Sequence, residues 1–246
     1  MGFFFNIGRY FIFLKNVFAR PEKWRIYYER TIDECYHIGI GSLAIVSIMS
    51  VFIGAVITLQ TSYNIDSPWI PLYTVGFTAR QSIILEFSPT IISLILAGIV
   101  GSKISSEIGS MRISQQIDAL DIMGVNSAGY LVLPKIIGAI IMFPFLIIIS
   151  MFLGLVGGWV FGQLTGQVTS YEYIYGVQYW FDPYSIKYAL TKTLAFAFLI
   201  TSIASFYGYF TSGGSVEVGQ SSTRAVVVSS IFILITNYLL TQLLLL

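Results

Sequence analysis

Residues 102–124 read SKISSEIGSMRISQQIDALDIMG, and this stretch decides the fold because it interrupts an otherwise apolar chain. Its five charged side chains are Lys103, Glu107, Arg112, Asp118 and Asp121. A charged residue at the centre of a membrane helix costs about 2.5–3.5 kcal/mol, so together these charges would cost more than about 12 kcal/mol. The stretch is therefore not expected to cross a membrane, although the sequence on both sides of it can.

The composition places the chain in a membrane. Its 246 residues are 56% hydrophobic and 10% charged, and the mean hydropathy is +0.80. A soluble domain carries about 25% charged residues, so this deficit of charge predicts an integral membrane protein. The net charge of +1 gives no basis for nucleic-acid binding.

Several chemistries are excluded by the residues that the chain lacks. Zinc sites usually take several Cys or His ligands, and the chain offers only Cys35 and His37. A single His ahead of the first apolar run also argues against an intramembrane serine protease. The chain has no phosphate-binding G-x-x-x-x-G-K-[ST] motif, and its nearest approach, at residues 98–103, has the wrong spacing. We expect no catalytic residue, metal or cofactor, and any ATP must be bound by a partner subunit.

Uncharged windows predict an all-α fold with five membrane-spanning helices, since a bilayer core needs about 20 apolar residues in a helix. The windows are residues 38–65, 87–102, 136–171, 193–216 and 225–246. The second becomes a full span when Glu86 and the residues before it are included. The sequence shows no internal repeat, so we expect one domain over residues 1–246. This domain comprises an N-terminal interfacial segment at 1–35 and a transmembrane bundle at 36–246.

The distribution of Lys and Arg predicts the orientation. Ten of these residues lie before the first span, between spans two and three, or before span five, and three, Arg80, Lys187 and Lys192, lie on the opposite side. Positive residues favour the cytoplasmic side of a membrane. The N-terminus and residues 102–124 are therefore expected in the cytoplasm, and the C-terminus on the far side.

Apolar residues recur at helical spacing near the N-terminus. They are Phe4, Ile7, Phe11, Leu14 and Phe18, and the opposite face carries Asn6, Arg9, Asn16 and Arg20. This pattern predicts an amphipathic helix in the headgroup plane that ends at Pro21. A signal peptide fits less well, because Arg9 and Lys15 interrupt the apolar run and no basic segment precedes it.

The polar interruption is itself predicted to be an amphipathic helix. Ile113, Ile117 and Leu120 form one apolar stripe, and Gly109 and Gly124 mark the ends. Such a helix can lie on the membrane, cap its own bundle or dock into a groove on another protein. The residues alone do not separate the first two alternatives from docking on another protein.

Three ordered blocks carry a family resemblance. They are AGIVGSKISSEIGSMRISQQIDALDIMGVN at 97–126, STRAVVVSS at 222–230 and VFIGAVITLQ at 51–60. Together with the order and length of the spans, they resemble MlaE-type permeases over essentially the whole chain. These are the membrane subunits of ABC transporters that move phospholipids across the bacterial envelope with mammalian-cell-entry (MCE) proteins.

The resemblance implies a permease homodimer in the bacterial inner membrane. It implies two cytoplasmic ATPase subunits below the dimer, a hexameric periplasmic MCE protein above it and, as an optional component, a small cytoplasmic STAS-like subunit. The polar interruption would then be the coupling helix that docks on the ATPase. Its candidate coupling residues are Glu107, Arg112, Ile113, Gln115, Ile117, Asp118 and Leu120. Each of the polar ones is alternatively a solvated surface residue.

Glu86 is the candidate polar residue of a lipid site, because carboxylates within membrane spans usually mark function. The resemblance implies a place beside a lipid cavity at the dimer interface, where Glu86 would accept hydrogen bonds from a headgroup or from Arg80. A hydrated position at the membrane surface is the alternative. The candidate aliphatic walls are Val56, Ile57, Leu59, Leu72 and Ile84, although ordinary packing or lipid contact explains each equally well.

Two positions depart from the family pattern. Leu85 and Ile99 stand where relatives commonly have Arg, which leaves the details of headgroup contact open. In the third span Gly154, Gly158, Gly162 and Gly166 recur every four residues, a spacing that lets helices approach closely. We expect internal helix packing there, with a glycine-lined dimer seam as the alternative. A non-transporting scaffold for an MCE tunnel and a small channel remain the alternatives to a lipid permease.

Overall fold

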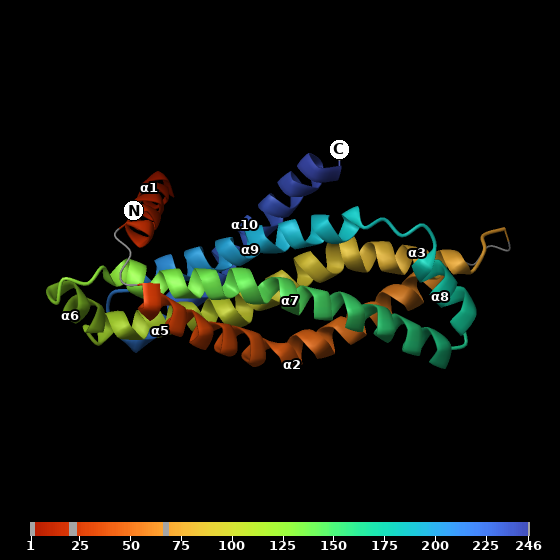
Figure 1. The fold of residues 1–246 in the computed structure, drawn as a ribbon, viewed down its shortest axis with the longest axis horizontal. Helices are drawn as coiled ribbons and strands as arrows, with labels where there is room; N and C mark the ends of the chain where they lie inside the picture. The colour runs from red at the N-terminus through yellow and green to blue at the C-terminus, as the bar shows by residue number, and fades with distance from the viewer. Residues whose placement is uncertain (1–2, 20–23, 66–68, 246) are drawn as a thin grey trace. The chain divides into compact units, whose positions relative to one another are not determined.

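The computed structural model describes residues 3–19, 24–65 and 69–245, and these residues form helices joined by short turns, with no β-strand among them (Figure 1). Five helical segments are long and apolar enough to cross a membrane. They are Tyr27–Asn64, Tyr73–Ile113, Ser127–Leu164, Tyr184–Tyr209 and Ser215–Leu244. The predicted all-α fold with five spans is confirmed.

The helices follow one another along the chain with short connections. The first is α1 (Phe3–Phe18), followed by α2 (Trp24–Asn64). The second span joins α3 (Tyr73–Ser82), η1 (Ile83–Ile91), α4 (Ile92–Leu96), η2 (Ala97–Gly101) and α5 (Ser102–Ile113) without a break. The remaining helices are α6 (Gln116–Ile122), α7 (Ser127–Leu164), α8 (Ser170–Gln178), α9 (Tyr184–Tyr209) and α10 (Ser215–Leu245).

The helices exceed the apolar windows because their polar ends are helical as well. The exceptions are the third and fourth windows. The third was predicted to hold one tilted helix and an extension up to residue 171, and the fourth ran to residue 216, whereas α9 ends at Tyr209. Helix α7 ends at Leu164, where Gly166 adopts a left-handed backbone with φ of +68°. Helix α8 then begins with a capping box in which the side chains of Thr169 and Glu172 each bond the other's backbone N–H.

The second span contains two π-helical segments, η1 and η2. Pro89 lies inside η1, where its ring displaces the carbonyl of the preceding turn and its nitrogen has no hydrogen to donate. A π-turn accommodates this defect by widening the helix, and such turns occur frequently at functional sites. Glu86 lies in the first turn of η1.

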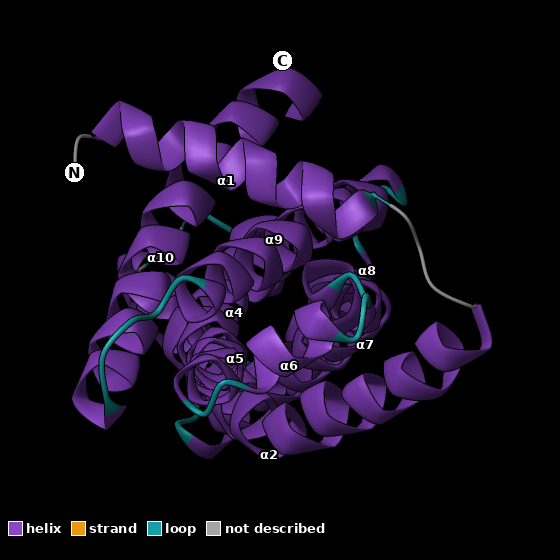
Figure 2. Ribbon diagram, turned by 90° about the vertical axis from the view of Figure 1, so that its left-hand side faces the viewer, coloured by secondary structure: helices purple, strands orange, loops and turns teal. Residues whose placement is uncertain are grey.

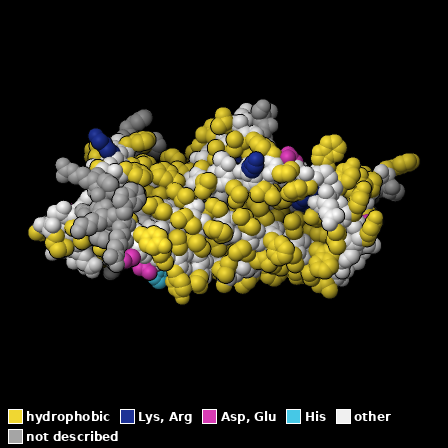
Figure 3. Space-filling view, in the orientation of Figure 1, with side chains coloured by type: hydrophobic (Ala, Val, Ile, Leu, Met, Phe, Trp, Pro, Cys, Tyr) yellow, Lys and Arg dark blue, Asp and Glu magenta, His cyan; other side chains and the backbone are white. Residues whose placement is uncertain are grey.

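The chain forms two compact units. The first unit comprises Met1–Ser42, Leu96–Phe143 and Ala195–Leu239. The second comprises Leu43–Ile95, Pro144–Leu194 and Leu240–Leu246. Hydrophobic side chains predominate on the face shown in Figure 3, as expected for a protein that contacts lipid.

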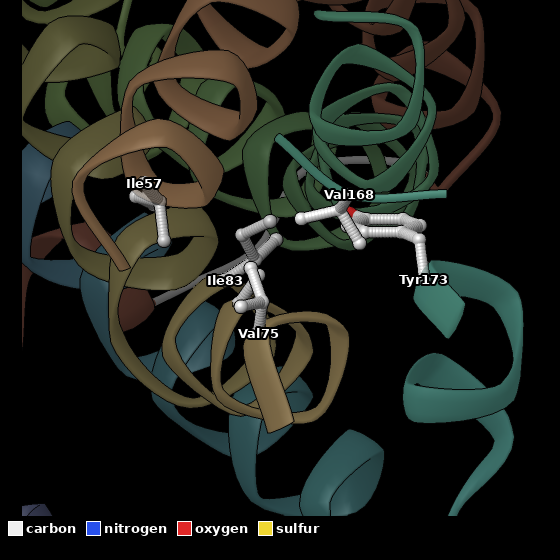
Figure 4. Close-up of a cluster of buried hydrophobic side chains, with 6 residues drawn as sticks. Ile57, Val75, Ile83, Val168 and Tyr173 are labelled. Carbon is white, nitrogen blue, oxygen red and sulfur yellow. The ribbon is translucent and has the colours of Figure 1, made fainter. Parts of the chain in front are cut away.

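An aliphatic and aromatic cluster forms the core of the second unit. Ile57 comes from α2, Val75 from α3 and Ile83 from η1, and they pack with Val168 and Tyr173 near the start of α8 (Figure 4). Burial raises the pKa of the Tyr173 phenol, so its hydroxyl stays protonated. It donates a hydrogen bond of 3.1 Å to the carbonyl of Leu155.

Glycines bring the backbones of α2 and α7 into contact within the second unit. A Cβ added at Gly54 would overlap the backbone of Gly154, and one at Gly158 would overlap the side chains of Thr58 and Tyr173. Gly162 also faces Thr58. The predicted role in internal helix packing is therefore confirmed for Gly154, Gly158 and Gly162. It is wrong for Gly166, which lies beyond the end of α7 and has no neighbouring atom where a Cβ would stand.

Helix α1 belongs to the first unit and is apolar on two faces. Phe13 and Val17 are buried, and the Phe13 ring packs against the rings of Phe206 and Tyr209 near the end of α9. Figure 2 shows the course of α1 and α9 as ribbons. Phe11 and Phe18 lie on the exposed side, with exposures of 65% and 55%. This exposed apolar face agrees with a helix in the headgroup plane. Arg20 and Pro21 lie outside the described residues, as do the side chains of Phe4 and Asn6.

The predicted polar face of α1 is partly wrong. The Arg9 guanidinium does not face outward but stacks 3.7 Å from the centre of the Phe210 ring. The Tyr10 hydroxyl lies 2.7 Å from that of Ser202 on α9. Helical spacing alone could not reveal that a second face of α1 is covered by protein.

Candidate functional site

An ion pair joins η1 to α9 in the second unit. The Lys192 ammonium lies 2.7 Å from Glu86 Oε1. The Lys192 side chain is 0% exposed, whereas that of Glu86 is 42% exposed. A buried ammonium requires a compensating charge, and Glu86 supplies it while keeping part of its carboxylate accessible.

Three hydroxyl groups surround the same carboxylate. Thr90 donates to Glu86 Oε2 at 3.1 Å, and Thr241 donates to Oε1 at 3.3 Å. The Tyr188 hydroxyl lies 3.5 Å from Oε1 and 2.9 Å from Thr241 Oγ1. These five residues, Glu86, Thr90, Tyr188, Lys192 and Thr241, are called the Glu86 cluster below.

The cluster arises from helical spacing in two segments that are distant in sequence. Tyr188 and Lys192 are four residues apart on α9 and therefore share a face. The Lys192 ammonium also lies 4.4 Å from the centre of the Tyr188 ring, a cation–π distance. The result is a neutral polar site, formed by one carboxylate, one ammonium and hydroxyl groups, within otherwise apolar spans.

Arg80 is not the partner of Glu86, contrary to the sequence-based expectation. Its guanidinium donates to the carbonyls of Val177, Tyr179 and Trp180, at 2.8, 2.9 and 3.3 Å. It is 2% exposed. Arg80 therefore ties α3 to the end of α8 and to the turn that follows it.

Lys192 is the functional candidate that sequence reasoning missed. It was counted only as a charge on the far side of the membrane. The available signal was its position four residues after Tyr188, directly before the uncharged window that begins at residue 193. Its carboxylate partner lies 106 positions away in sequence, so spacing could not identify the pair.

The predicted aliphatic walls are only partly brought together. An apolar groove of about 230 Å³ between α2 and η1 is lined by Val56 and Ile57, with Phe52, Phe87 and other apolar residues. Leu59, Leu72 and Ile84 do not line this groove. Leu72 is 41% exposed elsewhere, whereas Ile84 is 4% exposed and packs inside the protein. The role of these five residues in lipid contact stays a prediction.

The polar interruption is not one helix. Its first half, α5, continues the second span, and Gly109 is buried within it instead of ending it. The break occurs at Gln115, whose φ of 61° is left-handed, and α6 follows. Gly124, with φ of +80°, follows the C-cap residue Met123 and marks the end of α6, as predicted. Arg112 on α5 pairs with Asp118 on α6 at 2.7 Å across the break.

The predicted apolar stripe faces its own bundle. Ile117 is 0% exposed, and Ile113 and Leu120 are half-buried. The exposed apolar side chains are instead Ile122 and Met123, at 87% and 68%. Sequence reasoning missed Ile122 and Met123 because the spacing of apolar residues along a helix does not show whether they pack against their own bundle or against a partner.

The polar coupling candidates have different surroundings. Gln115 and Asp118 are exposed, and Arg112 is half-buried. Glu107 accepts from Lys135 Nζ at 2.9 Å, and Glu34 accepts from the same ammonium at 2.5 Å. Glu107 therefore braces α5 against α7 and α2 within the first unit.

Comparison with known proteins identifies relatives over nearly the whole chain. The family model described as permease MlaE matches residues 31–243. A probable ABC transporter permease protein of Rickettsia bellii is 35% identical over 97% of this chain and 92% of its own length. One from Synechocystis sp. is 32% identical over 95% of this chain and 88% of its own. The chloroplastic protein TRIGALACTOSYLDIACYLGLYCEROL 1 of Arabidopsis thaliana is 27% identical over 92% of this chain and 65% of its own.

Proposed function

The chain belongs to the MlaE permease family of ABC transporters, and on that premise we propose that it carries a phospholipid through the inner membrane of a bacterial cell. The proposed assembly is a permease homodimer with two cytoplasmic ATPase subunits and a hexameric periplasmic MCE protein. A small STAS-like subunit is an optional component. The N-terminus lies in the cytoplasm, in agreement with the distribution of Lys and Arg.

The Glu86 cluster is the observation that carries this proposal. A charged pair within apolar spans is costly and is retained mainly where it serves a function. Because Glu86 is 42% exposed, its carboxylate can accept hydrogen bonds from the polar headgroup of a lipid. The apolar groove lined by Val56 and Ile57 lies in the same unit and offers a surface for acyl chains.

Two further observations support the proposal. The Arabidopsis relative takes its name from a galactosylated diacylglycerol, which is a lipid. The most apolar window of the fifth span is only 11% buried, which leaves a long apolar surface for a second copy of the chain. The proposed role is that of a transport subunit, which needs no catalytic residue.

The surface around α6 is the proposed docking site for the ATPase. Ile122 and Met123 supply exposed apolar contacts, and Gln115, Asp118 and Asp121 surround them with polar groups. This arrangement resembles a protein interface, in which an apolar centre is enclosed by a polar rim. The ATPase would bind and hydrolyse ATP, because this chain has no phosphate-binding loop.

Lipid retention tests the proposal against the scaffold alternative. The purified chain should retain phospholipid after detergent washing, measured by mass spectrometry of extracted lipids. Glu86→Lys should reduce the retained amount because it places two positive charges together, and Glu86→Gln should reduce it less. An unchanged amount in Glu86→Lys, with the MCE protein still bound, would favour a scaffold that holds the tunnel without a lipid site.

A further inference from the structure

A second groove lies in the first unit, between α2 and the η2–α5 segment. It has a volume of about 220 Å³ and shares no residue with the Glu86 cluster. Glu34 and His37 line it from α2, and Lys103 and Glu107 line it from α5. The groove therefore brings carboxylate, imidazole and ammonium groups to one place.

The groove has a polar end and an apolar end. Along α2, the polar residues Glu34 and His37 are followed by Ile38, Gly41 and Ser42, whose side chain is buried. Along η2 and α5, the order is reversed, with Ile99 first and Lys103 and Glu107 after it. Seven residues separate the two ends on α2, which corresponds to about 10 Å at 1.5 Å per residue. A ligand that fills this groove must itself be polar at one end and apolar at the other.

A buried ammonium fixes the carboxylates at the polar end. Lys135 is 3% exposed and binds Glu34 at 2.5 Å and Glu107 at 2.9 Å. Each carboxylate has further lone pairs that can accept hydrogen bonds from a ligand. Lys103 is exposed and forms no ion pair with any residue in the part of the chain that the structure describes.

The charges at the polar end sum to zero. Glu34 and Glu107 are balanced by Lys135 and Lys103, and the ring nitrogens of His37 add further hydrogen-bonding groups. A zwitterionic ligand leaves this balance unchanged, whereas an anionic ligand adds a net negative charge beside two carboxylates. Electrostatic complementarity of this kind selects among ligands more than it increases affinity.

From this arrangement we propose that the groove binds the headgroup end of phosphatidylethanolamine. The headgroup ammonium donates to Glu34 and Glu107, and the phosphate accepts from Lys103 and His37. Choline fits less well because its quaternary ammonium has no N–H to donate. The acyl end follows the apolar part of the groove past Gly41 and Ile99. This is a second lipid site, beyond the one proposed at the Glu86 cluster.

Gly41 offers a variant that fills the groove without disturbing the protein. Gly41 lines the groove, and a Cβ added there would meet no heavy atom within 4 Å. In Gly41→Phe the ring occupies space that is open in the protein. Gly219→Phe is the matched control, because Gly219 also lies on an exposed helical surface of the first unit with no atom within 4 Å.

The charge requirement is tested at Lys103. Lys103→Glu removes the phosphate partner and adds a third carboxylate, whereas Lys103→Arg keeps the positive charge. Glu86→Lys serves as the separate arm for the other site, so that the two lipid sites can fail independently.

The experiment measures the lipid retained by the full chain after purification from vesicles of phosphatidylethanolamine, phosphatidylcholine and phosphatidylglycerol. Gly41→Phe and Lys103→Glu should each retain one phosphatidylethanolamine fewer per chain than the parent. Lys103→Arg and Gly219→Phe should retain the parental amount. The lipid lost should be phosphatidylethanolamine and not the other two.

Each result separates the two sites. If Glu86→Lys loses lipid and Gly41→Phe does not, the groove is refuted and the Glu86 site stands. If Gly41→Phe loses lipid and Glu86→Lys does not, the groove stands and the Glu86 site is refuted. Equal loss of phosphatidylcholine or phosphatidylglycerol would contradict the proposed headgroup.

Discussion

Removing Glu86 should destabilise the protein more than removing Lys192, because the two partners differ in exposure. In Glu86→Gln the Lys192 ammonium is left without its carboxylate at a side chain that is 0% exposed. Breaking a buried pair in this way costs about 3–5 kcal/mol. In Lys192→Met the remaining carboxylate is 42% exposed. Water can then reach Glu86, and the cost should be nearer the value of about 1 kcal/mol for exposed pairs.

Thermal unfolding in detergent measures this difference. A loss of 1 kcal/mol lowers the Tm of a chain of this size by about 2–4 °C. Glu86→Gln should therefore lower the Tm by about 6–20 °C, using the cost of a broken buried pair. The double variant with Lys192→Met should recover most of this loss, because it removes the uncompensated charge. Asp121→Asn, an exposed carboxylate on α6, is the control and should leave the Tm unchanged.

Two results would refute this reasoning. One is a Glu86→Gln protein that is as stable as Lys192→Met. The other is a double variant that is less stable than Glu86→Gln alone, since this would mean that Lys192 is stabilising without its partner. Either result would show that Glu86 and Lys192 do not form the ion pair described above.

The other predictions concern docking, packing and topology. Replacing Ile122 and Met123 by Asp should release the ATPase in a pull-down from detergent, because each substitution removes apolar burial worth about 1.5–3 kcal/mol. Retention of the ATPase by this variant would contradict the docking surface. Ile117→Ala should instead lower the Tm, because it creates a cavity that costs about 2–5 kcal/mol. Gly54→Leu should abolish correct folding, seen as aggregation in size-exclusion chromatography, because its side chain overlaps the backbone of α7; a monodisperse, stable variant would exclude that close approach. A Cys at Leu243, which is 76% exposed, should react with an impermeant maleimide from the periplasm in a Cys35→Ser background; labelling from the cytoplasm would mean an even number of spans.

The number of spans could be predicted because length and hydropathy alone determine it. A window of some 20 uncharged residues has few alternatives to a membrane helix. The charged residues 102–113 were wrongly separated from the second span, because α5 is helical but projects beyond the apolar window. The break at Gln115 depends on a left-handed backbone at a residue that does not require one, and composition gives no signal for it.

The candidate site was predicted only in part, for a physical reason that differs from residue to residue. Glu86 could be found because a carboxylate near an apolar run is conspicuous. Its partner could not be assigned, since pairing depends on which faces of η1 and α9 meet. Ile117 was assigned to the wrong surface because an apolar stripe fits its own bundle as well as a partner. Which face of a helix is buried depends on the folded chain and cannot be read from the spacing of its apolar residues.

The most direct test of the central claim is ATP-driven transfer of lipid in a reconstituted system. The chain, its ATPase and its MCE protein are placed in donor vesicles that contain fluorescent phospholipid, and the signal in acceptor vesicles is followed after ATP is added. We expect transfer that requires ATP and falls to background when Glu86→Gln is combined with Lys192→Met, which leaves no uncompensated buried charge, while the complex stays assembled. Transfer by this double variant at the parental rate, or an ATP-independent signal of equal size, would contradict a permease that handles lipid at the Glu86 cluster.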